Sequence, residues 1–223
     1  MNWIGEDLIM IEKYLNAFFD KEIKRLIEDG DIYNEFSLQH ELGIYLREKL
    51  GEMYKVQFER NIADELSITK DAIKSSDPKK WEMDICIKDK QNPLIKYAIE
   101  LKHPRNEQCP EQMYSFVKDI YFAEWLKKNG FAETYCITLV DDSKFYKWPE
   151  RNKKSENKIY EYFRNPVNVI QGTIEKPTGK NKGIEKIKLE NKYLFEWKNI
   201  EKVDSKYRYY VIALADKEAL QTQ

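Results

Sequence analysis

The stretches WEMDICIK (residues 81–88) and LIKYAIELK (residues 94–102) decide the fold of this chain. Successive side chains of a β-strand point to opposite faces. In the first stretch, Asp84 lies opposite the face that carries the apolar side chains; in the second, Glu100 and Lys102 lie opposite the apolar face. If the two strands pair as a hairpin through residues 89–93, two carboxylates and one ammonium group converge on one face of a sheet.

Asp84, Glu100 and Lys102 together have the chemistry of a hydrolytic metal site. Two carboxylates can hold a hard divalent cation through oxygen. An adjacent lysine can orient a water molecule and offset developing charge, so the three groups are the parts needed to hydrolyse a phosphodiester. The competing interpretation is a solvated hairpin face on which glutamate and lysine pair across strands.

The elements around the hairpin predict an α/β protein. Ser37 is a good N-cap and Gly51 a good stop for a helix over 37–50. Pro110 and Gly130 bound a second helix through Asn129, since proline favours the first helical position and glycine the residue after the last. With strands at 53–62 and 132–140 and a loop at 64–80, the expected order over residues 37–140 is αβββαβ.

The chain is expected to form one domain over residues 1–223. Residues 1–30 supply an N-terminal helix, predicted by apolar side chains at helical spacing over 4–29. Residues 37–140 form the core, and residues 141–217 form a C-terminal β elaboration. Within this elaboration we expect a short helix at 155–164, strands at 167–175, 184–190, 193–197 and 207–214, and a frayed end at 217–223.

The charge balance excludes some classes of protein. Charged residues make up 35% of the chain, but the net charge is only −1. This argues against a disordered polyelectrolyte and against strong indiscriminate nucleic-acid binding. The charge is uneven, however, because residues 144–208 hold 17 basic and 9 acidic residues. This C-terminal part could supply phosphate contacts, or it could be an ordinary lysine-rich surface.

The cysteines and the hydropathy indicate a cytoplasmic protein. Cys86, Cys109 and Cys136 are widely spaced and form no C-x-x-C pair, which suits a reducing compartment. They are also too few for a four-thiolate metal site. No segment approaches ~20 uninterrupted apolar residues, so no membrane span is expected.

The order of elements and the position of the acids resemble the PD-(D/E)XK nuclease superfamily, which has the restriction-endonuclease-like fold. Asp84 falls in the second strand, where the first acid of the signature belongs. Glu100-Leu101-Lys102 ends the third strand and matches the E-x-K part, with 15 residues between the two acids. The proline of the signature is absent before Asp84. The resemblance covers a little under half of the chain.

The resemblance implies roles for these residues. Asp84 and Glu100 would be metal ligands, and the main-chain carbonyl of Leu101 would be a further oxygen ligand. Lys102 would position the attacking water or help to deprotonate it. The expected cofactor is Mg²⁺, with Mn²⁺ able to substitute.

Four further residues are candidates at the same site. Glu41, on the helix before the first strand, matches the place of an extra catalytic acid in many members; it could also be a solvated helix residue. Gln112 sits where some members carry a glutamine, although this chain has Phe116 where their Q-x-x-x-Y motif has tyrosine. His103 and Arg105 follow E-x-K and could bind a substrate phosphate, as guanidinium groups do.

These observations predict a metal-dependent deoxyribonuclease, in a restriction- or defence-related role that only the family analogy suggests. DNA is the expected substrate and RNA remains open. A homodimer is plausible, since two sites can cut both strands of a duplex. The alternative is a nucleic-acid-binding or protein-interaction module that has the same fold and cleaves nothing.

Overall fold

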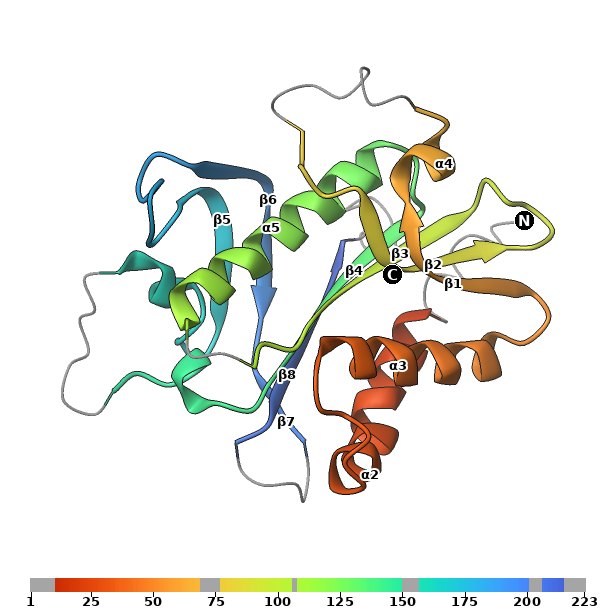
Figure 1. Cartoon of the computed structure of the whole chain (residues 1–223), viewed down its shortest axis with the longest axis horizontal. Coiled ribbons are helices and arrows are strands. Elements are labelled where there is room, and N and C mark those ends of the chain that lie inside the picture. Colours follow the sequence, from red (N-terminus) through yellow and green to blue (C-terminus); the bar gives the residue numbers. More distant parts are fainter. Residues whose placement is uncertain (1–10, 69–76, 106–107, 150–156, 201–205, 215–223) are drawn as a thin grey trace, which may run out of the picture.

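A computed structural model describes residues 11–68, 77–105, 108–149, 157–200 and 206–214 (Figure 1). The expectations for residues 1–10 and 215–223 lie outside this part of the chain. Its helices include helical residues from Ile11 that continue through a π-helical turn at Phe18–Glu22 into α2 (Ile23–Glu28), followed by α3 (Glu35–Leu50), α4 (Ile62–Leu66) and α5 (Cys109–Lys128). Short 3₁₀ turns lie at Ser143–Phe145 and Lys158–Tyr162.

The strands form a six-stranded sheet and a separate hairpin. In spatial order the sheet contains β1 (Tyr54–Asn61), β2 (Glu82–Asp89), β3 (Lys96–Lys102), β4 (Glu133–Val140), β8 (Arg208–Leu214) and β7 (Lys198–Asn199). Among the strands described, only β3 and β4 are parallel neighbours, and α5 lies between them in the sequence. The hairpin pairs β5 (Asn168–Glu175) with β6 (Lys186–Phe195). The predicted mixed α/β class is confirmed.

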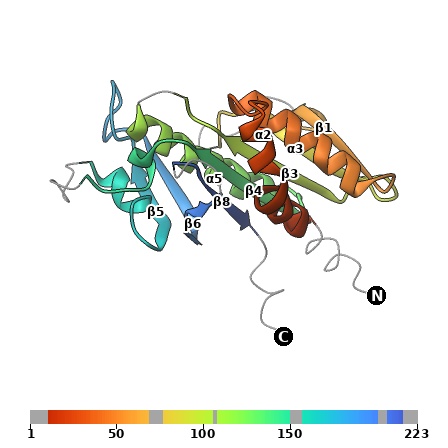
Figure 2. The same cartoon turned by 90° about the horizontal axis from the view of Figure 1, so that it is seen from below.

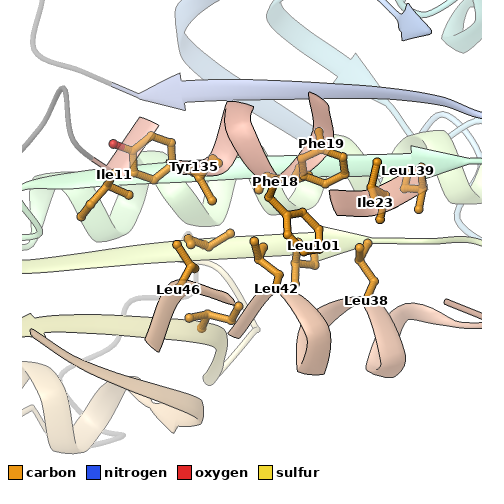
Figure 3. Packing of buried hydrophobic residues seen from close by; sticks show 14 of the residues in the cluster. Ile11, Phe18, Phe19, Ile23, Leu38, Leu42, Leu46, Leu101, Tyr135 and Leu139 are labelled. Carbon is orange, nitrogen blue, oxygen red and sulfur yellow. The ribbon is translucent and has the colours of Figure 1, made fainter. Parts of the chain in front are cut away.

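Helices and the hairpin cover the two faces of the sheet. On one face, α2 and α3 lie side by side (Figures 1 and 2) and pack on alternate residues of the central strands. Figure 3 shows Leu38, Leu42 and Leu46 of α3 directed towards the strands, close to Leu101 of β3. On the other face, α5 and the β5–β6 hairpin share a core with β4 and β8. The side chains that alternate with Leu101 along β3 therefore face α5.

The start of α3 differs from the prediction by two residues. Asn34 is the N-cap, and its side chain accepts a hydrogen bond of 2.8 Å from the main-chain N–H of Ser37. Ser37 returns the interaction by accepting from the N–H of Asn34, so it closes a capping box instead of starting the helix. As a result, Glu35 lies in the first turn of α3 and outside the range predicted from sequence.

The predicted hairpin is confirmed. β2 and β3 pair antiparallel, with Ile85 opposite Ile99 and Lys88 opposite Lys96. The predicted loop at 64–80 instead begins with α4, because the Asn61 side chain caps the N–H of Ala63 and starts a short helix.

Asn191 and Lys192, which were predicted to separate two strands, lie instead within the single strand β6 and form an irregularity there. The register changes here, since Ile170 pairs with Tyr193 and Gly172 pairs with Leu189. Glu124 of α5 stabilises this β-bulge. Its buried carboxylate accepts from the main-chain N–H groups of Glu190 and Asn191, and from the Tyr193 hydroxyl at 2.8 Å.

None of the helices in the described ranges has both the length and the apolar character that crossing a bilayer requires.

Replacement of Glu124 tests the attachment of the hairpin to α5. We expect Glu124→Ala to lower the free energy of unfolding by about 2–4 kcal/mol, because buried N–H and O–H donors lose their acceptor. Urea denaturation measures this change. The control is Glu190→Ala, which removes only an exposed ion pair with Lys128 and should change stability by less than about 1 kcal/mol. Equal effects of the two variants would contradict the assignment.

Candidate active site

The structure brings Asp84, Glu100 and Lys102 together on the α5 side of the sheet, at the end of β3. Asp84 is 9% exposed and Glu100 is 1% exposed. Both carboxylates contact the ammonium group of Lys80, which lies just before β2. The predicted convergence of the two acids is therefore confirmed, and a lysine that the sequence did not single out lies between them.

Asp84 occupies a point where β2 and β3 stop pairing. The last paired residues of these two strands are Ile85 and Ile99. One residue further, Asp84 Oδ2 accepts a hydrogen bond of 2.7 Å from the main-chain N–H of Leu101. The aspartate side chain thus takes the place of a backbone partner, and this bond fixes the orientation of the carboxylate.

A side chain of α3 binds the main chain of Asp84. Glu59, on the neighbouring strand β1, has φ of 46°, which is uncommon for a residue other than glycine. Gln39 of α3 is buried, and its Nε2 donates to the carbonyl oxygen of Asp84 at 2.6 Å. The same Nε2 donates to Glu59 Oε1 at 2.5 Å, so one buried amide joins the strained residue to Asp84. Backbone strain is concentrated at functional sites.

Asp119, near the middle of α5, is the third acid of the cluster. It is buried, and its carboxylate lies 3.9 Å from the Lys80 ammonium and 3.4 Å from that of Lys102. It therefore connects the two lysines.

Lys102 reaches the first turn of α3. Its ammonium lies 2.9 Å from Glu35 Oε1, and it donates to its neighbour's carbonyl oxygen, Leu101 O, at 2.9 Å. The second oxygen of Glu35 accepts from the N–H of His103 at 3.3 Å. Glu35 is thus the acid of α3 that meets the cluster.

The cluster carries more negative than positive charge. Four carboxylates (Glu35, Asp84, Glu100 and Asp119) share the ammonium groups of Lys80 and Lys102. Burial, together with repulsion by Asp84, raises the pKa of Glu100 well above its ordinary value, although Lys80 opposes the shift. Burial also raises the pKa of Asp119.

The two lysines are held in their charged form. Burial alone would lower the pKa of Lys80, but the surrounding carboxylates, Glu100 first, outweigh it and raise the pKa. The pKa of Lys102 is raised in the same way, against the effect of burial, chiefly by Asp119 and Glu35.

The donor set suits a hard cation. One oxygen of Glu100, Oε1, is buried and has no hydrogen-bond partner among the described residues. Asp84, Glu100 and the Leu101 carbonyl offer oxygen ligands, which Mg²⁺ and Mn²⁺ prefer. In the described ranges, no three His, Cys, Asp or Glu side chains are grouped so that they could hold a metal ion together. An ion would therefore need the main-chain oxygen, water or a shift of side chains.

The remaining predicted residues, His103, Arg105 and Gln112, make contacts outside the cluster. His103 is buried, its Nδ1 lies 3.0 Å from the carbonyl oxygen of Leu139, and burial lowers its pKa. Arg105 forms an ion pair with Asp141. Gln112 lies in the first turn of α5, where its N–H donates to Gln108 O.

Glu41 is not brought to the cluster. Its carboxylate lies 3.4 Å from the ring of His40. It is two residues beyond Gln39, about 200° further around the helix, so it projects from the face opposite the one that meets Asp84. Its catalytic role stays a prediction.

A groove of about 650 Å³ opens beside the cluster, between α5, residues 77–80 and β6. Lys80 and Asp119 belong both to the cluster and to the lining of this groove. The other charged residues of the lining are Lys79, Lys118, Lys186 and Lys188 with Asp77 and Glu185, and Tyr121 and Ile187 form an apolar wall. Lys118 is paired with Glu185. The lining therefore holds more basic than acidic side chains, and the groove leads to the buried acids.

Sequence reasoning missed Lys80, Asp119, Glu35 and Gln39. Asp119 left a signal, since it is a charged residue within the apolar stripe formed by Phe116, Ile120 and Ala123. Glu35 was missed because the helix was predicted to begin at residue 37, whereas α3 begins at Glu35. Lys80, in a polar loop, left none.

Comparison of the chain with protein-family models, with curated proteins and with solved structures finds no match. A function must therefore be argued from the residues of this chain.

The loss of folding stability caused by the buried charge of Glu100 can be measured. A carboxyl group with a raised pKa binds more protons in the folded than in the unfolded state, so its contribution to stability falls as pH rises above the ordinary value. Glu100→Gln should therefore raise the midpoint of thermal unfolding at pH 8 by about 2–4 °C or more, the shift that 1 kcal/mol produces in a domain of this size. Near pH 4 the gain should shrink.

Glu41→Gln is the matched control and should leave the midpoint unchanged at both pH values. A Glu100→Gln variant that is less stable than the wild type at pH 8 would show that its charge stabilises the fold.

Proposed function

We propose that this protein is a metal-dependent nuclease with a restriction-endonuclease-like fold, which hydrolyses phosphodiester bonds in DNA. One observation carries the proposal. Two buried acids from neighbouring strands, Asp84 and Glu100, contact the same ammonium group, that of Lys80. Lys102 lies two residues after Glu100 on β3. The order of elements around them, α3, β1, β2, β3, α5 and β4 with α4 inserted after β1, supports the resemblance noted in the sequence.

Asp84, Glu100 and the Leu101 carbonyl would hold Mg²⁺ or Mn²⁺. When bound, such an ion neutralises phosphate charge and lowers the pKa of coordinated water. The chain contributes the orientation: Leu101 N–H and Gln39 fix the side chain and the main chain of Asp84, respectively. Prearranged ligands of this kind need little reorganisation during the reaction.

Lys102 acts in this proposal as a cation. Its partners are carboxylates and a carbonyl oxygen, all of them acceptors, so it is held as an ammonium group. A charged lysine can orient a water molecule and stabilise the negative charge that develops on the phosphate. Glu35 and Asp119 position its ammonium group.

The groove supports a polyanionic substrate. Its lysines lie within reach of a nucleic-acid backbone that approaches the acids along α5, and Tyr121 offers an aromatic surface to a base. DNA is the proposed substrate, with RNA as an outcome of the assay. A restriction- or defence-related endonuclease that acts as a homodimer is the biological setting that the family analogy suggests.

One observation favours a second function, a binding module without cleavage. Lys80 already partly neutralises both acids, as a resident ammonium group would in a protein that takes no metal. Such a module would bind nucleic acid in the groove and would bind no divalent cation.

Cleavage of four substrates tests the proposal: supercoiled plasmid, linear duplex, single-stranded DNA and RNA, each with Mn²⁺ or Mg²⁺. We expect cleavage by the wild type, and a loss of about 10²-fold or more in Asp84→Asn and Lys102→Met, because each removes charge stabilisation from the reaction. Circular dichroism must show that the variants are folded. Cleavage by the variants at the wild-type rate, or no cleavage of any substrate, would contradict the proposal.

The two acids of α3 can be distinguished in the same assay. Glu35→Gln should lower the cleavage rate about tenfold or more, because it removes a partner that orients Lys102. Glu41→Gln should change the rate less than Glu35→Gln does. The reverse order would assign the catalytic acid of this helix to Glu41, as the sequence predicted.

A further inference from the structure

We propose that Lys80 is a built-in cation of the acidic cluster, which competes with a divalent metal ion for the oxygens of Asp84 and Glu100. This inference rests on the proposed metal-dependent function. It concerns a residue that the E-x-K pattern does not include.

The contacts of Lys80 define its position. Its ammonium lies 2.9 Å from Asp84 Oδ1, contacts Glu100 Oε2 and lies 3.9 Å from Asp119 Oδ1. One positive group is thus shared by three acids that come from β2, β3 and α5. Its side chain is 29% exposed, whereas the acids on which it lies are almost fully buried.

The charge of the cluster explains why a metal ion would replace this lysine. With Lys80 in place, the carboxylates still exceed the ammonium groups by two, and Glu100 Oε1 remains buried without a partner. A divalent ion bonded to the same oxygens brings twice the charge of an ammonium group, and it can also bind the unpartnered oxygen. A metal ion and the Lys80 ammonium at the same carboxylate oxygens would repel each other, so binding of one disfavours binding of the other.

The local structure leaves room for the Lys80 side chain to move away from the acids. It belongs to the irregular segment 77–81 and not to a helix or strand, so no ladder of main-chain hydrogen bonds holds its backbone. The same side chain lines the 650 Å³ groove. Rotation about its side-chain bonds can therefore carry the ammonium from the acids into the groove. Lys102, in contrast, is fixed on β3 between Glu35 and Asp119.

Calorimetric titration with Mn²⁺, in the absence of nucleic acid, tests the competition. We expect Lys80→Met to bind Mn²⁺ about tenfold or more tightly than the wild type, since it keeps most of the length of the side chain and removes the charge. Lys80→Arg should stay near the wild type. Lys79→Met, which removes a neighbouring exposed lysine, is the matched control for a general change of charge and should also stay near the wild type.

The possible outcomes separate the inference from the proposed function. If the wild type binds Mn²⁺ in a manner that depends on Glu100, but Lys80→Met binds it no more tightly, the competition is wrong and the metal site stands. If neither protein binds Mn²⁺, both ideas are wrong.

A measurement on the wild type keeps the test valid should Lys80→Met fail to fold. Reductive methylation followed by mass spectrometry reports how accessible each lysine amine is. Lys80 should react slowly in a metal-free buffer with chelator and several-fold faster at saturating Mn²⁺, while Lys79 should react equally in both. Unchanged protection of Lys80 at saturating Mn²⁺ would overturn the proposal.

Discussion

The burial of three carboxylates, those of Asp84, Glu100 and Asp119, between the sheet and α5 is the constraint on which the rest of this structure depends. Isolated buried charges are costly, and they persist only where they are paired and hydrogen-bonded. Four elements supply the acids that take part in this pairing. β2 and β3 supply Asp84 and Glu100, α5 supplies Asp119, and the start of α3 supplies Glu35.

The strand residues of this cluster could be predicted from the sequence because the period of a β-strand is simple. Alternation alone placed Asp84, Glu100 and Lys102 on one face, and the short connection at residues 89–93 made antiparallel pairing the natural arrangement. α5 could be predicted in a similar way, because proline and glycine mark its two ends. For these reasons, the mixed sheet followed from local patterns, whereas α4 between β1 and β2 did not.

The residues that complete the cluster could not be predicted in the same way. Whether Glu35 belongs to α3 depends on a capping box, in which Asn34 and Ser37 are both plausible first residues. Lys80 reaches the acids through a side chain on an irregular segment, and no periodicity governs such contacts. Glu41 was chosen by its place in a family pattern, whereas helix geometry turns Gln39, and not Glu41, towards Asp84.

α5 carries two buried acids with different duties. Asp119 contacts the lysines of the cluster, and Glu124, five residues later, holds the irregular part of β6. Five residues span about 7.5 Å along a helix axis, so both acids move as one rigid unit. A shift of α5 caused by a displaced hairpin would therefore also move Asp119 relative to the strands that carry Asp84 and Glu100.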